Sequence, residues 1–369
     1  MLGWSSDSSR KSYTVRKLPY YFVIPFLFYG CLRNPGEENI VFFTRADFKD
    51  TEFLKADTFI FHEPLNPFSY LILKDTLILV TNLSHPEHFV EVYDLNTKKF
   101  ICATAKKGRG PGEFLSCQVY YNNNDNYFSI IDIVAKSWGK FNIDSLINYK
   151  NYYMPEKFNL PDFVKEVAEL DSISFIGYNM WYIDNRKYFN NTEKLIIWNK
   201  RSKPLLKNNS TEKFFEVINI TGAYVVVSPN KDKIILPYLY DDKIEFYDNK
   251  LNIIKVLKGP DNFNVEFDEY GRKVVFKDGK YYRAFFPFYF ARNAFYIIYI
   301  GANGLKSDEN YRKPVEVFKI SWEGELLKRY QLDNYIFNIS LDSKEENIYG
   351  THWKKFGNPP ILLKYCIKH

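Results

Sequence analysis

Six stretches of the chain share one pattern of apolar and polar residues. Each begins with an apolar run, crosses a polar turn and returns in a second run that holds an aromatic residue. The return runs read VEVYDL, WGKFNI, LIIWNK, IEFYDN, VEVFKI and LLKYCI. Short runs of this kind, bounded by polar turns, predict β-strands. The six stretches start at Asp75, Asn126, Ser172, Asp232, Asn293 and Glu346.

Each stretch extends into a unit of about four strands. Tight turns such as DLNTKK and SWEGEL follow the return runs, and short apolar runs such as AYVVVSP precede most units. Four-stranded units at a spacing of roughly 45–60 residues are typical of β-propellers. A pair of β-sandwiches would not repeat an aromatic-centred strand six times, and a β-helix has shorter coils. The sequence therefore predicts an all-β, six-bladed propeller with four-stranded antiparallel blades over residues 39–369.

A propeller of this kind must close its ring, because an open sheet edge invites aggregation. The early run NIVFFT, from Asn39, is expected to share a sheet with the last run, ILLKYCI, from Ile361.

The N-terminal segment, residues 1–30, reads as a lipoprotein-type signal peptide. Lys11, Arg16 and Lys17 precede an apolar run over 18–29, which is followed by Gly30 and Cys31. A basic region, a short apolar region and a small residue at the end are typical of secretory signals. The run is too short for a membrane-spanning helix. We expect Cys31 to be lipidated, with an ordinary signal and a chance cysteine as the alternative, and residues 31–38 to form a tether.

The segment KKGRGPGEF lies between the last strand of the first unit and the first strand of the second. Glycine can adopt backbone conformations closed to other residues, and proline stiffens a turn. Phe114 is expected to wedge between the two blades, while Glu113 accepts backbone N–H groups or pairs with Arg109. The segment lacks the spacing of a phosphate-binding P-loop, and no helix pattern follows it. The predicted blade connector comprises Gly108, Arg109, Gly110, Pro111, Gly112, Glu113 and Phe114.

With its lipoprotein-like N-terminus, KKGRGPGEF motif and aromatic-rich repeats, the sequence resembles the six-bladed, TolB-like propeller lipoproteins of Bacteroidetes bacteria. The connector is also similar to that of NHL-type propellers, and SPNKDKI, from Ser228, is similar to the TolB-like turn and strand. The resemblance implies the fold and an outer-membrane lipoprotein of the cell envelope, periplasmic or surface-exposed. It implies no settled activity.

Composition adds a bias toward sheet and no sign of nucleic-acid binding. The chain has 30 Tyr and 33 Phe, and its net charge is +6. Aromatic residues favour strands, whereas nucleic-acid binding needs basic residues gathered on one face. The lysines are scattered. Cys102, Cys117 and Cys366 show no metal-binding spacing, and we expect them to be buried, unpaired thiols.

Tyrosine and tryptophan residues at predicted strand ends are the strongest candidates for ligand binding. Most aromatic residues of a propeller pack between blades, but Tyr and Trp carry a polar tip that also suits a recognition surface. Such residues with Asp and Asn nearby would suit a sugar or a peptide. The candidates are Tyr178, Trp181, Tyr238, Tyr240, His352 and Trp353.

Catalytic motifs are weaker. His85 and His88 form HPEH, which invites a metal interpretation, but two ligands on a turn make a poor site. Some propellers resembling this one are calcium-dependent hydrolases or lyases with inward-facing Glu, Asn and Asp. Here Asp132, Asn179 and Asn303 could take that role, although they form no convincing set. We therefore predict a monomeric, exported binding protein for a protein, peptide or glycan ligand, with no cofactor. A metal-dependent hydrolase or lyase, with calcium in the channel, is the alternative.

Overall fold

The computed structural model describes residues 39–369 apart from short gaps. The gaps are residues 60–67, 122–125, 151–153, 162–163, 180–192, 200–203, 210–221, 264–265, 271–272, 278–281, 302–312, 354–359 and 368–369. The predicted signal peptide and tether, including Cys31, lie outside the described residues. Residues 38–369 form one compact unit.

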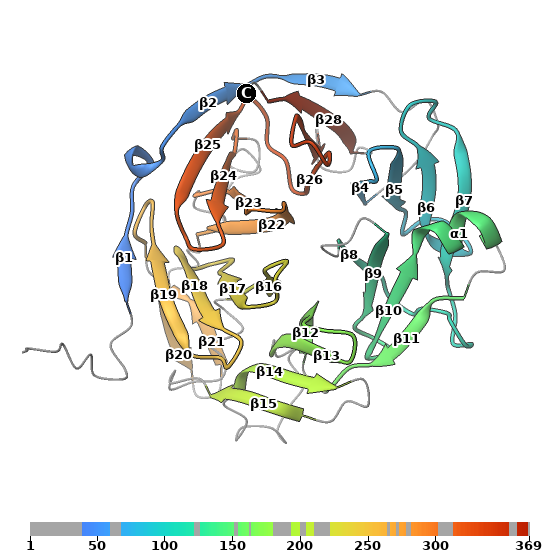
Figure 1. Ribbon diagram of the computed structural model, residues 1–369, viewed down its shortest axis with the longest axis horizontal. Coiled ribbons are helices and arrows are strands. Elements are labelled where there is room, and N and C mark those ends of the chain that lie inside the picture. Colours follow the sequence, from blue (N-terminus) through green and yellow to red (C-terminus); the bar gives the residue numbers. More distant parts are fainter. Residues whose placement is uncertain are drawn as a thin grey trace, which may run out of the picture. The chain divides into compact units, whose positions relative to one another are not determined.

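Six sheets ring a central axis in this unit, as predicted (Figure 1). In each sheet, strands adjacent in sequence pair antiparallel, from the innermost outward. Blade 1 comprises β4 (Ser69–Leu73), β5 (Leu77–Thr81), β6 (His88–Asp94) and β7 (Phe100–Lys106). Blade 2 comprises β8 (Gln118–Tyr121), β9 (Tyr127–Asp132), β10 (Ser137–Asn142) and β11 (Glu156–Asn159), with helix α1 (Ile143–Tyr149) between its last two strands. Blade 3 comprises β12 (Val164–Glu169), β13 (Ser174–Asn179), β14 (Glu193–Asn199) and β15 (Pro204–Asn209).

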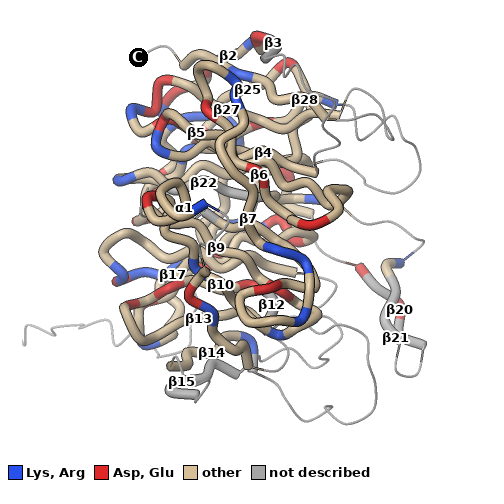
Figure 2. Tube along the Cα trace, turned by 90° about the vertical axis from the view of Figure 1, so that its right-hand side faces the viewer, with Lys and Arg blue, Asp and Glu red and all other residues tan. Residues whose placement is uncertain are grey.

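The second half of the ring follows the same order. Blade 4 comprises β16 (Val226–Val227), β17 (Lys233–Pro237), β18 (Lys243–Asp248) and β19 (Ile253–Lys258). The hairpin of β20 (Phe267–Tyr270) and β21 (Lys273–Phe276) interrupts the connection to blade 5, and Figure 2 shows it apart from the blades. Blade 5 comprises β22 (Phe285–Phe290), β23 (Ala294–Tyr299), β24 (Glu316–Ser321) and β25 (Leu326–Leu332). Blade 6 takes β26 (Ile339–Leu341), β27 (Asn347–His352) and β28 (Ile361–Cys366) from the C-terminal end.

The N-terminal residues 39–59 form a strap along the outside of three blades, visible as the blue segments in Figure 1. Strand β1 (Ile40–Phe42) adds to β19 in parallel, and after the short 3-10 helix η1 (Arg45–Asp47), β2 (Thr51–Leu54) adds to β25 in parallel. Strand β3 (Ala56–Phe59) then pairs antiparallel with β28 as the fourth strand of blade 6.

The ring is therefore closed by an N-terminal strand, but not by the one predicted from sequence. The run from Asn39 pairs with blade 4, and residues 56–59 pair with the run from Ile361. The prediction was wrong because NIVFFT has the stronger apolar pattern, whereas ADTF has little. At the outer rim of a blade, a segment can form a strand through backbone hydrogen bonds even if few of its side chains are apolar.

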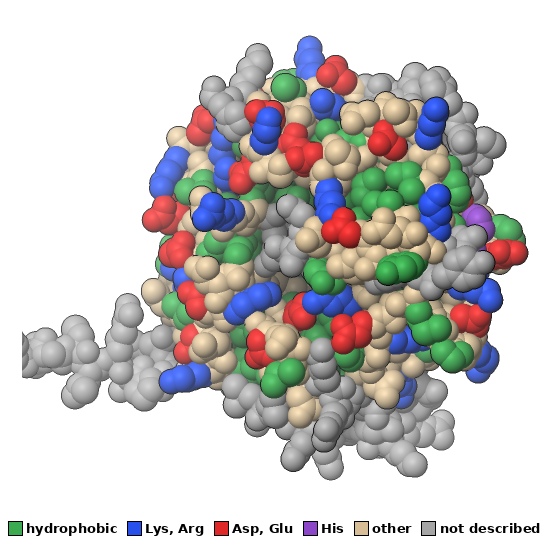
Figure 3. Space-filling model, turned by 45° about the vertical axis from the view of Figure 1, so that its right-hand side comes forward, with side chains coloured by type: hydrophobic (Ala, Val, Ile, Leu, Met, Phe, Trp, Pro, Cys, Tyr) green, Lys and Arg blue, Asp and Glu red, His purple; other side chains and the backbone are tan. Residues whose placement is uncertain are grey.

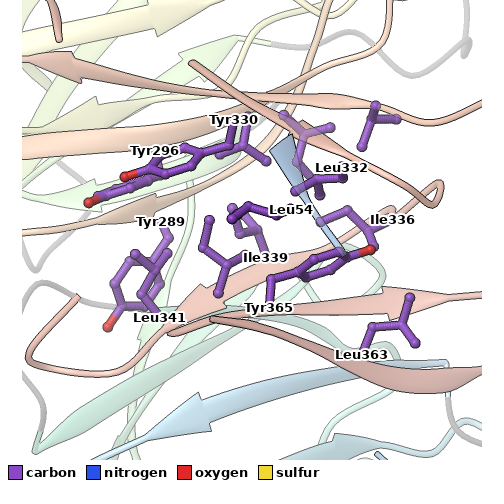
Figure 4. Close-up of a cluster of buried hydrophobic side chains, with 14 of the residues drawn as sticks. Leu54, Tyr289, Tyr296, Tyr330, Leu332, Ile336, Ile339, Leu341, Leu363 and Tyr365 are labelled. Carbon is purple, nitrogen blue, oxygen red and sulfur yellow. The ribbon is translucent and has the colours of Figure 1, made fainter. Parts of the chain in front are cut away.

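Apolar side chains fill the spaces between neighbouring blades. The close-up in Figure 4 shows the cluster between blades 5 and 6, where Tyr296, Tyr330 and Ile339 lie near Leu54 of the strap. Phe43 and Phe48 of the strap belong to a second cluster, between blades 4 and 5. The strap is thus anchored by three buried side chains as well as by its strand pairing.

The connector between blades 1 and 2 has the predicted place, and two of its three glycines have a positive φ angle. Gly108 and Gly112 have φ angles of 153° and 74°, whereas Gly110 is not among the residues with positive φ. Glu113 accepts the N–H of Gly110 at 2.7 Å, which holds the turn closed. The first of the two roles predicted for Glu113 is thus confirmed, and its ion-pair partner is Lys106, at 3.0 Å, instead of Arg109.

Phe114 is fully buried in the apolar cluster of blades 1 and 2, which confirms the predicted wedge. A Cβ on Gly139 would lie 2.5 Å from its ring, so the glycine leaves space for this side chain.

The three cysteines of the described region are free thiols. Cys102 is buried, and burial raises the pKa of its thiol to about 11. Cys366 is exposed, so the expectation that all three are buried was wrong for this residue. In the same part of the chain, no helix has the length and apolar character needed to cross a membrane.

We expect Leu54→Ala to lower the free energy of unfolding by about 2–4 kcal/mol, because it empties a buried position between blades 5 and 6. Leu54 is 3% exposed, whereas its neighbour Phe53 in β2 is 57% exposed. Phe53→Ala is the matched control and should cost less than about 1 kcal/mol. Urea denaturation measures both, and equal losses would show that the strap is not anchored through Leu54.

Candidate functional site

The ring has two faces, which differ in the loops they carry. In each blade the strands alternate in direction, so the loop between the second and third strands shares a face with the connection to the next blade. We call this the upper face. The loops between first and second strands, and between third and fourth strands, lie on the lower face. Binding residues of scaffolds concentrate in such loops.

Polar and aromatic residues from five blades lie on the upper face, near the ends of the innermost two strands of each blade. Tyr120 and Glu166 lie in the first strands β8 and β12. Tyr224, Arg283 and Tyr335 lie shortly before the first strands β16, β22 and β26, and Tyr240 follows β17. We call this set the mouth cluster: Tyr120, Glu166, Tyr224, Tyr240, Arg283 and Tyr335.

Electrostatic interactions connect the side chains of the mouth cluster. Glu166 is only 3% exposed. Burial raises the pKa of Tyr120 and of Tyr224, and the Glu166 carboxyl raises both further. Burial also raises the pKa of Tyr335, while the Arg283 guanidinium opposes that shift. Arg283 also opposes the rise in the pKa of Tyr224, so it lies near two tyrosines of different blades.

Backbone hydrogen bonds fix the segments that carry these side chains. The N–H of Tyr224 donates to Pro237 O at 3.1 Å, and the N–H of Leu239 donates to Gly222 O at 2.8 Å. The N–H of Ala284 in turn donates to Leu239 O at 2.7 Å. The segments before Tyr240 and after Arg283 are thereby joined directly, although they belong to blades 4 and 5. A binding site is more selective when its side chains are held in fixed positions in this way.

Three aromatic rings form a second feature on the upper face, at the junction of blades 6 and 1. The rings of Phe337 and Trp353 lie 4.4 Å apart, and Phe68 lies 6.4 Å from each. Phe68 is 49% exposed, and the other two are half-buried. We call these three residues the aromatic shelf. His352 lies beside it, with Nδ1 2.6 Å from the carbonyl oxygen of Tyr335.

The residues predicted from sequence divide into two groups. Tyr240, His352 and Trp353 lie in the mouth cluster or at the aromatic shelf, on one face. Tyr178 and Tyr238 are fully buried in the apolar cluster of blades 3 and 4. Trp181 lies outside the described residues.

Tyr238 hydrogen-bonds to a buried ion pair, Lys194 with Glu245, between blades 3 and 4. Its hydroxyl donates to Glu245 Oε2 at 2.8 Å, and Lys194 Nζ lies 2.6 Å from the same oxygen. Tyr247 donates to that oxygen as well, and Lys243 pairs with Oε1 at 3.2 Å. Burial alone would raise the pKa of Glu245, but the two lysines outweigh it and lower the pKa to about 2. This cluster holds two blades together.

The other candidates from sequence have structural partners. Nδ1 of His85 accepts the backbone N–H groups of Glu87 and His88, at 3.1 and 2.9 Å, which orders the turn. Asp132 accepts the N–H groups of Leu115 and Ser116 and so anchors the connector. Asn303 and the side chain of Asn179 lie outside the described residues. Within the part of the chain that is described, no group of three or more metal-ligating side chains occurs.

Sequence reasoning missed most of the mouth cluster. Five of its members lie in or just before first strands: Tyr120, Glu166, Tyr224, Arg283 and Tyr335. The repeating sequence pattern runs over the second and third strands instead. First strands are short, from two residues in β16 to six in β12 and β22, and show less alternation. The usable signal was a polar or aromatic residue just before each short run, as in AYVVV and YIFNIS.

Comparison with known proteins agrees with the propeller fold. The model of the TolB-like six-blade propeller family matches residues 47–344. The chain belongs to this family. No curated protein matches it. Among solved structures, this TolB-like propeller is similar to a DUF4221 family member from Bacteroides vulgatus, with a TM-score of 0.52 and 9% identity, over 85% of this chain and 98% of that one.

Two further structures are similar at a TM-score of 0.46. One is an exported-protein candidate from Bacteroides fragilis, with 12% identity over 87% of this chain and 100% of that one. The other is the β-propeller domain of Cps50 (Swd1) from Myceliophteria thermophila, with 7% identity over 85% and 100%. At these identities the likeness concerns the fold alone.

We expect Lys194→Met to lower the free energy of unfolding by about 3 kcal/mol at neutral pH, because Glu245 loses a buried partner. The folded pKa of Glu245 lies below its usual 4.5. Its contribution is therefore present above about pH 4.5 and is lost as pH falls through about 2. The variant should lose less stability than the parent over that window.

The control for this variant is Lys233→Met. Lys233 pairs at 2.8 Å with Glu323, whose side chain is 62% exposed. Loss of this exposed pair should cost below about 1 kcal/mol. Denaturant titrations from acid to neutral pH measure both variants. A Lys194→Met protein as stable as the control would contradict the assigned role of the buried pair.

Proposed function

We propose that this propeller is an exported, lipid-anchored binding protein that takes a glycan or peptide at the upper mouth of its channel, without chemical change. One observation carries the proposal: the mouth cluster gathers side chains of five blades at one place on one face. Packing between two neighbouring blades does not require groups from five blades at one place. Convergent polar groups of this kind are the usual basis of a binding-site hypothesis.

The chemistry of the mouth suits a polar ligand of low net charge. It offers four tyrosine hydroxyls, which can donate and accept hydrogen bonds, with one carboxyl and one guanidinium. The aromatic shelf adds ring faces, on which sugar rings or apolar peptide side chains can pack. A phosphate-rich ligand would need several cations in the same place.

The surface fits a monomer that contacts the membrane only through its anchor and binds no nucleic acid. Acidic and basic residues are interspersed along the chain in Figure 2, and their side chains are interspersed on the part of the surface seen in Figure 3. Nucleic-acid binding depends on a concentrated basic surface. The anchor itself rests on the sequence pattern around Cys31, since several acyl chains on one cysteine give firm attachment.

We expect Glu166→Gln and Arg283→Ala each to weaken ligand binding at least tenfold, because each removes a charged group from the mouth. The probes are an array of bacterial and plant oligosaccharides and a random peptide array, applied to a soluble form of the protein that begins after Cys31. Asn96→Ala, in a lower-face loop of blade 1, is the control and should bind as the parent does. Hits that depend on neither Glu166 nor Arg283 would contradict a site at the mouth.

Cys31→Ser should move the protein from the membrane fraction to the soluble fraction of cells, because it removes the atom that would carry the lipid. Fractionation followed by immunoblotting measures the shift. Cys366→Ser is the control, since that cysteine is exposed but lies at the far end of the chain. Retention of the Cys31→Ser protein in membranes would overturn the anchor and leave the binding proposal untouched.

A further inference from the structure

A buried carboxyl at the junction of blades 4 and 5 has one oxygen bonded and one not. Asp242 ends the loop between β17 and β18 on the upper face and is fully buried. Its Oδ2 accepts the backbone N–H groups of Asp261 at 2.8 Å and Asn262 at 2.6 Å. No donor in the described part of the chain reaches its Oδ1. A buried, ionised carboxylate oxygen without a hydrogen-bond donor destabilises the folded protein.

A second carboxyl lies beside it and already holds the available donors. The Tyr299 hydroxyl donates to Asp261 Oδ2 at 2.8 Å and also interacts with Asp242. Arg45 of the strap contacts Asp261 through Nη1 at 2.5 Å and Nη2 at 3.4 Å. Since a hydroxyl has a single hydrogen, Tyr299 cannot donate to both carboxyls at once.

The other charged groups around the junction are engaged elsewhere. Arg45 also binds Glu316 at 2.7 Å, and Arg329 pairs with that carboxyl at 2.9 Å.

Next to Asp242 in the chain, Lys243 pairs with Asp241 at 3.4 Å and Glu245 at 3.2 Å. None of the ion pairs in the described residues includes Asp242. The charges around it therefore favour its neutral form.

We propose that the unpartnered Oδ1 of Asp242 binds a proton, which the carboxyl releases as the pH rises through neutrality. This carboxyl lies on the upper-face loop of blade 4, and its Oδ2 accepts hydrogen bonds from the connection to blade 5. It is a proton-binding site separate from the mouth cluster, although Tyr240 lies close to Asp242 in the sequence.

The titration of the site follows from its environment. Burial raises the pKa of Asp242 to about 7. The N–H groups of Asp261 and Asn262 and the Tyr299 hydroxyl oppose the shift, and the charge of Asp261 adds to it. The folded pKa thus lies above the ordinary 3.8. The stabilising contribution is complete below about pH 3.8 and is lost as pH rises to about 7. Above that pH, ionised Asp242 faces Asp261, and we expect the junction of strap and upper face to loosen.

The direct test is a carbon-13 NMR titration of aspartate carboxyl groups in the full propeller. The Asp242 resonance should titrate with a midpoint near pH 7. A midpoint below about pH 5 would overturn the proposal, because the carboxyl would then be ionised at neutral pH.

Thermal unfolding of Asp242→Asn gives an independent test, since asparagine imitates the protonated acid. The fall in midpoint temperature between about pH 4 and 7 should be smaller in this variant than in the parent. The matched control is Asp132→Asn. Asp132 is equally buried, but its two oxygens accept four donors, from Leu115, Ser116 (N–H and hydroxyl) and Ala135.

The control should lower the midpoint temperature at every pH and keep the slope of the parent. An Asp242→Asn protein that behaves in the same way would overturn the proton site. Neither test depends on a ligand, so the outcome is separate from that of the mouth proposal.

Discussion

The pairing of β3 with β28 is the interaction on which the rest of the structure depends. Blade 6 obtains three strands from the end of the chain and its fourth from residues 56–59, in a register that places Ala56 opposite Tyr365. Every other blade is completed by consecutive segments. Without this pairing β28 would present an open edge. The neighbouring strand β2 adds Leu54 to the cluster between blades 5 and 6. The N-terminal strap is therefore part of the fold and not an appendage.

Closure also sets the geometry of the candidate site. The mouth cluster takes its members from blades 2 to 6, so their separations depend on how many blades fill the ring and how tightly they pack. Glu166 of blade 3 and Arg283, which precedes blade 5, both act on Tyr224 of the blade between them. A propeller can thus build a polar site from single residues of short inner strands, each held by its own blade. The buried pair of Lys194 and Glu245 contributes to the same packing between blades 3 and 4.

Much of the fold was predictable from sequence, because six return strands repeat an aromatic residue at the same point of the pattern. The connector was predictable as well, since Phe114 follows a turn that only glycine-rich sequence allows. The strap was not, because β1 and β2 pair in parallel at the outer rim with β19 and β25, which lie far along the chain and share no pattern with them.

The site was predictable only in part. Tyr240 and Trp353 follow second strands, which carry the repeating pattern, whereas Glu166 and Arg283 lie in or just before first strands, which do not. Whether Tyr238 faces a ligand or the core depends on Glu245 of the next strand and on Lys194 of the preceding blade, and the second of these is a contact that no local pattern reveals.

Native-state hydrogen exchange across β3, β26 and β5 tests the role of the closing strand most directly. If β3 completes the ring, its amides should open with the same free energy, and the same dependence on denaturant, as those of β26 in blade 6 and β5 in blade 1. That result would show that the blades cannot stay folded once the closing strand leaves. Opening of β3 at a free energy several kcal/mol lower, with blades 6 and 1 still protected, would contradict the account.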